Sequence, residues 1–206
     1  MITHEGPWLE KGETLICFGD SITAAANGYV KILEEKLAKS GIKVVNAGRG
    51  GDKTPTALTR FQQAVLDAKP SAVSIYLGAN DSAIGHGRWA DEPQVQPVTY
   101  RDNLMWMAYL CKQNGINKIS IATPAWRFEG DAFADYGDAM TAYCLAARDA
   151  ADRMFTRLVP LDHAFATEWA KKTGHTGLLL TTDGIHMNQD GNQLIVNTML
   201  KTWNMV

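Results

Sequence analysis

The chain has 206 residues, of which 46% are hydrophobic, and carries a formal net charge of −2. This length supports one well-buried core but is short for two ordinary domains, so we expect residues 1–206 to form a single domain. Acidic and basic side chains are interspersed, without the basic stripe that a phosphate backbone requires, which argues against nucleic acid as a partner.

The sequence shows no segment for export or membrane insertion. The N-terminus lacks a basic stretch followed by an apolar one, and no run approaches the roughly 18 apolar residues that a membrane span needs. We therefore expect a soluble, cytoplasmic protein without a membrane span. If a signal peptide had been removed from this chain, we would instead expect a secreted protein. Cys17, Cys111 and Cys144 lie in apolar runs without Cys-x-x-Cys spacing, which predicts reduced, buried cysteines.

Five short runs are almost continuously apolar, the pattern of strands that are covered on both faces of a parallel sheet. In chain order they are residues 14–18, 43–46, 72–77, 118–122 and 157–161. Segments with helical spacing separate them, and the last segment repeats an apolar residue every four positions at Ile195, Met199 and Trp203. This alternation predicts a three-layer α/β/α sandwich with a mainly parallel five-stranded sheet in flavodoxin-like order.

Small and polar residues follow the first four predicted strands. These loops are residues 19–21, 46–52, 78–81 and 123–126. Each one alone is ordinary turn or cap chemistry. In a parallel sheet, however, ligands bind beyond the carboxyl ends of the strands, so the four loops together predict a functional site at that edge.

Gly19 and Ser21 end the first strand. We expect Gly19 to let the chain turn sharply, so that Ser21 exposes its hydroxyl near a helix start, where negative charge is favoured. A serine becomes a nucleophile only with a base, a group that orients the base, and donors for the oxyanion. His186 is the best candidate base because Asp183, three residues ahead, can bond one ring nitrogen and leave the other free. The other histidines are interpreted as structural or surface residues: His4, His86, His163 and His175.

Four blocks of the sequence resemble those of the SGNH (GDSL-type) hydrolases, in the same order. They are Gly19-Asp20-Ser21-Ile22-Thr23, the loop containing Gly51, Gly78-Ala79-Asn80-Asp81 and Asp183-Gly184-Ile185-His186. The resemblance runs from Gly19 to His186 and implies an α/β/α esterase or lipase that needs no metal and no other cofactor. It implies Ser21 as the nucleophile, His186 as the base and Asp183 as the orienting acid.

The same resemblance implies an oxyanion hole made by Ser21, Gly51 and Asn80. Gly48 and Gly50 compete with Gly51 for this role, and Gly51 is favoured because Asp52 and Thr54 follow it as in related sequences. The remaining acids of these loops, Asp20, Asp52 and Asp81, are assigned to turn and loop hydrogen bonds.

Three alternative functions fit the loops less well. A nucleotide-binding P-loop would need glycine where Ala47 and Asp52 stand, and the dinucleotide fingerprint would need glycine at Lys53. A flavodoxin-like receiver would need a lysine after the fifth strand, where the chain has Asp162 and His163. A metal hydrolase is disfavoured because Asp183 and His186 alone are too few ligands for zinc.

Loop residues at the same edge are candidates for the substrate pocket. Trp89 lies in the long segment 82–98, and Trp126 and Arg127 follow the fourth strand; these three side chains could wall an acyl pocket or stack on a sugar ring. The other tryptophans are attributed to core or helix packing: Trp8, Trp106, Trp169 and Trp203.

The sequence contains no extra hydrophobic lid to shield a fatty chain. We therefore expect a serine esterase that acts on a small-molecule ester with a short acyl group, acetyl above all, through an acyl-enzyme. The segment after Asn80-Asp81 is similar to small esterases related to isoamyl acetate hydrolase. Carbohydrate O-deacetylation, thioesterase or lysophospholipase activity, and a non-catalytic binding module on the same scaffold stay open, as does the oligomeric state.

Overall fold

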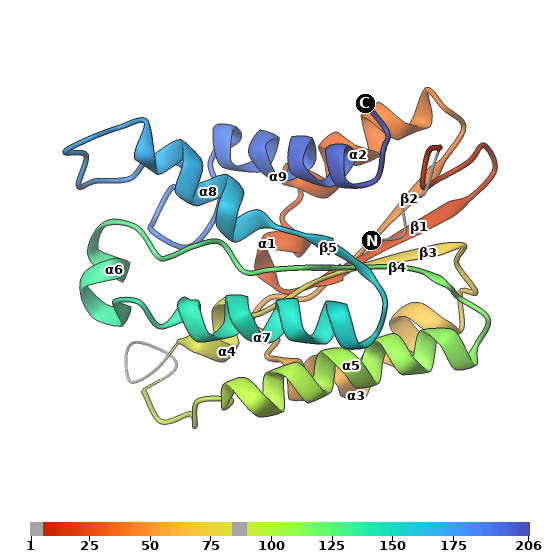
Figure 1. The fold of residues 1–206 in the computed structure, drawn as a ribbon, viewed down its shortest axis with the longest axis horizontal. Helices are drawn as coiled ribbons and strands as arrows, with labels where there is room; N and C mark the ends of the chain where they lie inside the picture. Colours follow the sequence, from red (N-terminus) through yellow and green to blue (C-terminus); the bar gives the residue numbers. More distant parts are fainter. Residues whose placement is uncertain (1–5, 84–89) are drawn as a thin grey trace.

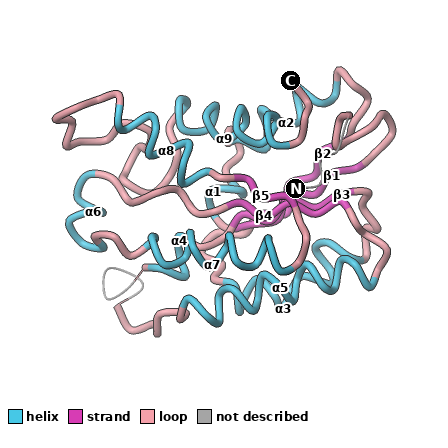
Figure 2. The backbone as a smooth tube through the Cα atoms, viewed as in Figure 1, coloured by secondary structure: helices cyan, strands magenta, loops and turns pink. Residues whose placement is uncertain are grey.

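A parallel sheet lies between two layers of helices in the computed structural model, which describes residues 6–83 and 90–206 (Figures 1 and 2). The strands are β1 (Thr14–Gly19), β2 (Lys43–Gly48), β3 (Ala72–Tyr76), β4 (Lys118–Ala122) and β5 (Arg157–Val159). Their order is β2-β1-β3-β4-β5, and every neighbouring pair is parallel. The predicted fold class and strand order are therefore confirmed.

The ends of the strands differ slightly from the predicted ranges. β1 and β2 extend to Gly19 and Gly48, because the register of these two strands continues to their glycines. β5 ends at Val159 rather than at residue 161. The next residue, Pro160, has no N–H to donate to a ladder, and Leu161 already begins a helix.

The helices cover both faces of the sheet and form two apolar layers. One layer contains α2 (Tyr29–Ala38), α8 (Leu161–Ala170) and α9 (Gln189–Thr202); the other contains α3 (Thr54–Phe61), its π-helical continuation η1 (Gln62–Leu66), α5 (Pro97–Gln113) and α7 (Met140–Arg153). The short helices α1 (Ser21–Ala24), α4 (Ala79–Ser82) and α6 (Gly130–Tyr136) follow the carboxyl ends of β1, β3 and β4. Within residues 6–83 and 90–206, every helix falls short of the length and apolarity required to cross a membrane.

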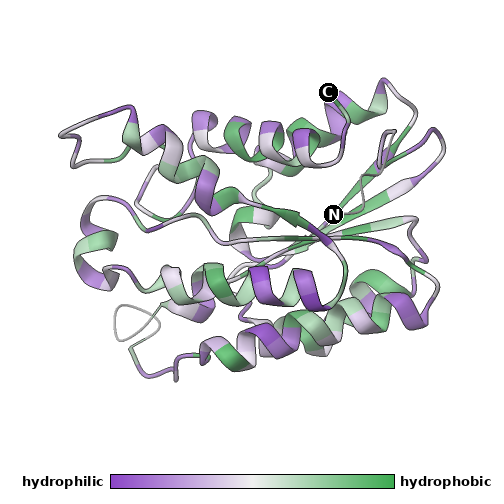
Figure 3. Ribbon diagram, in the orientation of Figure 1, coloured by the Kyte–Doolittle hydropathy of each residue, from purple (hydrophilic) through white to green (hydrophobic). Residues whose placement is uncertain are grey.

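The core matches the hydropathy of the sequence, with apolar strands between amphipathic helices (Figure 3). The three cysteines are free and buried, as predicted, and burial raises the pKa of each thiol to about 12. Trp8 stacks on Trp203 in this core. Trp106 lies outside the core, because 52% of it is exposed, and it stacks on Tyr109 of its own helix, α5, which fits the expected helix packing.

Gly19 is required for close packing, and its φ is not positive. A Cβ at this position would lie 2.4 Å from the carbonyl oxygen of Tyr76 and 2.1 Å from Oγ1 of Thr23. The expected sharp turn between β1 and α1 therefore needs no left-handed backbone at Gly19. The glycine instead lets α1 approach the carboxyl ends of β1 and β3, which places the first residue of α1, Ser21, at the edge of the sheet.

Three buried acids join the loops at this edge, as predicted. Asp20 caps α1 by accepting a hydrogen bond from the N–H of Ile22 at 2.9 Å. Asp81 accepts from both the N–H and the hydroxyl of Thr54, at 2.9 and 2.6 Å. Burial raises the pKa of Asp20 to about 7 and that of Asp81 to about 6, in spite of these hydrogen bonds.

The third acid, Asp52, pairs with Arg60, whose side chain joins two strand ends. The Nε of Arg60 contacts Asp52 at 2.6 Å, and its two terminal nitrogens donate to the carbonyls of Ala47 and Gly19, both at 3.0 Å. The guanidinium also lies 4.3 Å from the ring centre of Phe18. Arg60 therefore fixes the loop after β2 against the end of β1.

Substitution Gly19→Ala should destabilise the protein, because the added methyl group would overlap a backbone carbonyl that cannot move alone. We expect the free energy of unfolding in urea to fall by about 1–3 kcal/mol. Gly177→Ala is the control, since the nearest atom to its new Cβ would be 3.9 Å away, and it should change the value by less than about 0.5 kcal/mol. Equal effects of the two substitutions would contradict this packing role of Gly19.

The raised pKa of Asp20 predicts a pH-dependent stability. The buried carboxyl holds its proton more tightly in the folded state, so the stability from its protonated form is complete below about pH 4 and is lost as pH rises to about 7. Asparagine keeps the cap without titrating, so Asp20→Asn should gain stability relative to the wild type across this interval, by about 1.4 kcal/mol per unit of pKa difference. Urea unfolding at several pH values checks this, and parallel curves for the two proteins would refute it.

Candidate active site

Ser21, Asp183 and His186 form one hydrogen-bonded chain at the carboxyl edge of the sheet. Ser21 begins α1 directly after β1, whereas Asp183 and His186 lie in the loop that precedes α9. The Oγ of Ser21 lies 3.0 Å from Nε2 of His186, and Nδ1 of His186 lies 2.7 Å from Oδ2 of Asp183. The structure thus brings together the three side chains that the sequence predicts as a catalytic set.

The loop folds so that Asp183 orients the ring of His186. The second carboxylate oxygen, Oδ1, accepts from the backbone N–H groups of Ile185 and His186 at 2.9 and 2.7 Å. An antiparallel bridge between Thr181 and Met187 closes the base of the loop. Asp183 therefore holds the backbone of the loop with one oxygen and the imidazole with the other.

The charge of Asp183 determines which ring nitrogen of His186 carries the proton in the predicted catalytic set. Partial burial by itself raises the pKa of Asp183, but the hydrogen bonds from the ring and backbone of His186 and from Ile185 N–H outweigh it and lower the pKa below its usual value. An ionised Asp183 accepts from Nδ1–H, so Nε2 presents its lone pair to the Ser21 hydroxyl. About half of each side chain, 52% for Asp183 and 47% for His186, is exposed, so the predicted base is open to solvent.

The residues predicted for the oxyanion hole come from loops after three neighbouring strands, β1, β2 and β3. Asn80 is buried, and its side-chain amide donates to the Asp52 carbonyl at 3.1 Å, which leaves one amide hydrogen for another acceptor. Gly51 lies in a turn with φ +79°, and a Cβ on the preceding Gly50 would lie 4.0 Å from the Ser21 Cβ. In the described part of the chain, the backbone N–H groups of Ser21 and Gly51 have no hydrogen-bond partner.

Further polar contacts hold the oxyanion loops to each other. Thr54, at the start of α3, donates to Asp81 of α4 and accepts from the side chain of Asn103 at 3.1 Å. The carbonyl of Asp52 receives the amide of Asn80. The loops that carry Gly51 and Asn80 are therefore joined by direct hydrogen bonds, which keeps the donors of the site in fixed relative positions.

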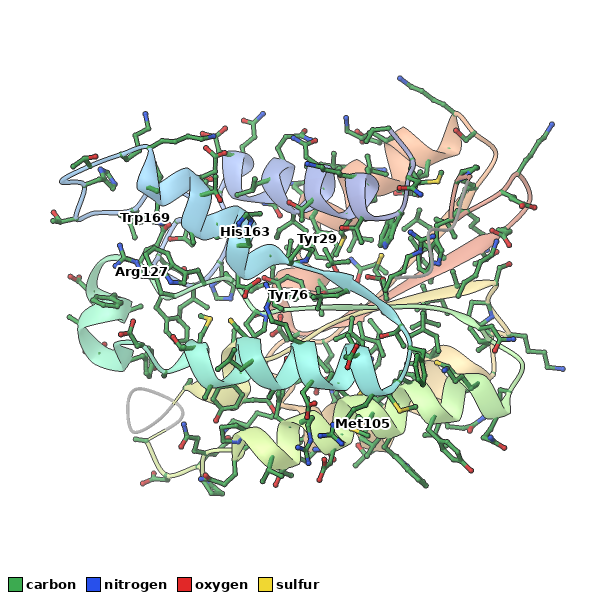
Figure 4. All side chains as sticks on the ribbon, viewed as in Figure 1. Tyr29, Tyr76, Met105, Arg127, His163 and Trp169 are labelled. Carbon is green, nitrogen blue, oxygen red and sulfur yellow. The ribbon has the colours of Figure 1, made fainter. Side chains whose placement is uncertain are left out.

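The predicted pocket residues Trp126 and Arg127 lie in an aromatic cluster beside this edge. The Arg127 guanidinium lies 4.5 Å from the ring centre of Trp126 and 4.8 Å from that of Phe133. It also lies 4.3 Å from the ring centre of Trp169, and Figure 4 labels Arg127 and Trp169. Cation–π packing by itself explains where Trp126 and Arg127 lie. A role of these two residues in substrate binding therefore stays a prediction. Trp89 lies outside the described residues.

Two side chains that support the site were missed by the sequence analysis. Arg60 joins the ends of β1 and β2, as described above. Glu129 is buried, with only 2% of the residue exposed. Its carboxylate accepts hydrogen bonds from Trp169 and from the backbone of residues 179–181. Neither residue stands in a recognisable motif; the only signal is a charged residue beside apolar ones, which is too common to identify a partner. Among the described residues, no group of three or more His, Cys, Asp or Glu side chains is placed to share a metal ion.

The chain is similar to curated bacterial proteins over about half of its length. The chain is 36% identical over 118 residues to the uncharacterized lipoprotein YqeF of Bacillus subtilis, covering 52% of this chain and 46% of that protein. It is 34% identical over 110 residues to Esterase TesA of Pseudomonas aeruginosa, covering 50% of each. The chain thus spans about half the length of the curated relatives that it matches.

A solved structure and a family model cover more of the chain. The crystal structure of the acetyl xylan esterase AlAXEase superposes with a TM-score of 0.79 at 26% identity, covering 91% of this chain and 98% of that one. The model of the GDSL-like Lipase/Acylhydrolase family matches residues 17–194. This match contains all four sequence blocks, from Gly19 to His186, and it covers most of the chain; the chain therefore belongs to the GDSL-like Lipase/Acylhydrolase family.

Proposed function

We propose that this protein is a serine esterase that hydrolyses carboxylic esters through an acyl-enzyme. The observation that carries the proposal is the continuous chain of hydrogen bonds from the Ser21 hydroxyl through His186 to Asp183, at 3.0 and 2.7 Å. This arrangement supplies a nucleophile, a base and an orienting acid in hydrogen-bond contact.

In the first step, Ser21 Oγ attacks the ester carbonyl while Nε2 of His186 takes the hydroxyl proton. The carbonyl oxygen becomes an oxyanion, which receives hydrogen bonds from the N–H groups of Ser21 and Gly51 and from the amide of Asn80. The carbon–oxygen bond to the alcohol then breaks, and His186 returns the proton to the leaving alcohol. In the second step, water adds to the acyl-serine by the same route and releases the acid.

A short acyl group, acetyl above all, is the expected substrate, because the sequence contains no extra hydrophobic lid to shield a fatty chain. The likeness to an acetyl xylan esterase also supports an acetyl ester as the substrate.

Carbohydrate O-deacetylation is a second candidate, because a groove that contains several amide side chains begins beside the loop of Asp183 and His186. The groove has a volume of about 560 Å³ and includes Thr182 and Met187, which flank the segment of Asp183 and His186. Asn27, Lys31, Asn188 and Gln189 also line it. Amide and hydroxyl groups suit a polyhydroxylated alcohol, and the acetyl xylan esterase named above is consistent with this class.

Two further expectations remain predictions. One is the single domain over residues 1–206. The other is the cytoplasmic location. Export is the alternative, because the chain is similar to a protein named as a lipoprotein.

Hydrolysis of p-nitrophenyl acetate, butyrate and octanoate tests the proposed function. The wild type should hydrolyse the acetate fastest without added metal, and Ser21→Ala should lose this activity while keeping the wild-type circular dichroism spectrum. Acetylated xylo-oligosaccharides, assayed by acetate release, test the second candidate. If Ser21→Ala retained the activity of the wild type, Ser21 would not be the nucleophile; a binding module would hydrolyse none of these esters.

Substitution Asp183→Asn should lower kcat by about 10³- to 10⁴-fold, because asparagine no longer fixes the tautomer of His186 that leaves Nε2 free. The measurement is kcat for p-nitrophenyl acetate above pH 6, where the lowered pKa of Asp183 keeps the wild-type carboxylate ionised. Asp190→Asn is the matched control in the first turn of α9 and should retain wild-type kcat. A kcat for Asp183→Asn within a few-fold of the wild type would show that Asp183 only holds the loop backbone.

A further inference from the structure

We propose that Glu129 is a positioning residue that holds the loop of Asp183 and His186 in its productive conformation. This inference rests on the proposed function, since the loop supplies the base and its orienting acid. Glu129 follows β4 and precedes α6, whereas the loop precedes α9, so the contact joins segments that are about 50 residues apart in sequence.

The Glu129 carboxylate is surrounded by donors from the segment that leads into the loop. Its Oε2 accepts from the backbone N–H groups of Leu179, Leu180 and Thr181 at 2.9, 3.1 and 3.0 Å. The Thr181 hydroxyl donates to the same oxygen at 2.6 Å, and the indole N–H of Trp169 donates to Oε1 at 2.7 Å. Only an acceptor without protons of its own can satisfy five converging donors, which explains a carboxylate at this buried position.

The backbone of Glu129 also contacts the catalytic loop itself. Its N–H donates to the carbonyl of Gly184, the residue between Asp183 and Ile185, at 2.9 Å. Gly184 has φ +90°, and a Cβ there would lie 2.2 Å from the Glu129 carbonyl oxygen. The Thr181 hydroxyl accepts from the N–H of Gly184 at 3.1 Å while it donates to the carboxylate. Glu129 is therefore joined to the residue beside Asp183 by two short routes.

The aromatic cluster keeps Glu129 in place. Trp169 donates its indole N–H to the carboxylate, and the Arg127 guanidinium packs against the face of the same indole ring at 4.3 Å (Figure 4). Arg127 therefore packs between Trp126 and the indole of Trp169 that donates to Glu129. A shift of about 1 Å in such a support can lower a rate about 100-fold without touching the reacting atoms.

The variant Glu129→Gln tests the proposal with little change in volume. Its amide NH₂ group must face an N–H donor, so the segment 179–181 should loosen and the contact between Asp183 and His186 should weaken. We expect kcat for p-nitrophenyl acetate to fall about 10- to 100-fold with KM changed less than about threefold. The acid limb of the rate should move to lower pH, because the Asp183 carboxylate is then held less firmly beside the ring of His186.

A second variant, Thr181→Val, breaks the hydroxyl link between Glu129 and Gly184 and should change kcat and the acid limb in the same directions by a smaller factor. The double variant Glu129→Gln with Trp169→Phe removes the indole N–H that the new amide would face. It should recover part of the kcat lost in Glu129→Gln when both are compared with Trp169→Phe alone.

The control is Asp162→Asn, which alters a carboxylate bonded to Thr123 and Arg148 and remote in sequence from residues 179–187. It should leave the acid limb unchanged. A Glu129→Gln protein that matches this control in kcat and acid limb would overturn the positioning role.

Amide hydrogen exchange gives a readout that does not depend on activity. Residues 179–188 should exchange faster in Glu129→Gln than in the wild type, whereas Asp162→Asn should leave their exchange unchanged. If the wild type hydrolysed no ester, the proposed function would fail while the exchange comparison still tested whether Glu129 holds the loop. Unchanged exchange in this segment would refute the inference even for an active enzyme.

Discussion

The hydrogen bond from Nδ1 of His186 to Asp183 is the interaction on which the proposed chemistry of this site depends. At 2.7 Å, it favours the tautomer in which Nε2 faces the Ser21 hydroxyl, and the proposed mechanism requires that tautomer to supply Ser21 with a base. Asp183 can do this because its other oxygen is held by two backbone N–H groups of the same loop. A four-residue segment thus sets both the position and the proton of the base.

The rest of the fold supplies what this short segment lacks. A parallel sheet gathers the loops after β1, β2 and β3 at one edge, where the nucleophile and the predicted oxyanion donors meet. Ionisable side chains then fix these loops: half-buried Arg60 holds the ends of β1 and β2, buried Asp81 holds Thr54, and buried Glu129 holds the segment before the loop of Asp183 and His186. The rigidity of the site therefore comes from side chains on neighbouring loops, while the exposed face of the triad stays open to substrate.

Much of the fold could be predicted from the sequence because its signals are local. Continuous apolar runs gave the strands within a few residues, and the spacing of Asp183 and His186 indicated their contact. The close packing around Gly19 could not be predicted, because it depends on the Tyr76 carbonyl, 57 residues later in the sequence. The exposure of Trp106 on α5 could not be predicted either. Glu129 and Arg60 were missed for the same reason: their partners are backbone groups of distant segments, which leave no pattern in the residues that carry them.

The central claim is that Ser21 is the single activated nucleophile of this chain. The most direct test is to treat the folded protein with a fluorophosphonate and to locate the adduct by mass spectrometry of its peptides. Our account predicts one adduct, on Ser21, which forms in the native protein and is abolished by prior unfolding in urea, because reactivity requires His186 at its folded position. An unmodified Ser21, or labelling spread over several serines at similar rates, would contradict it.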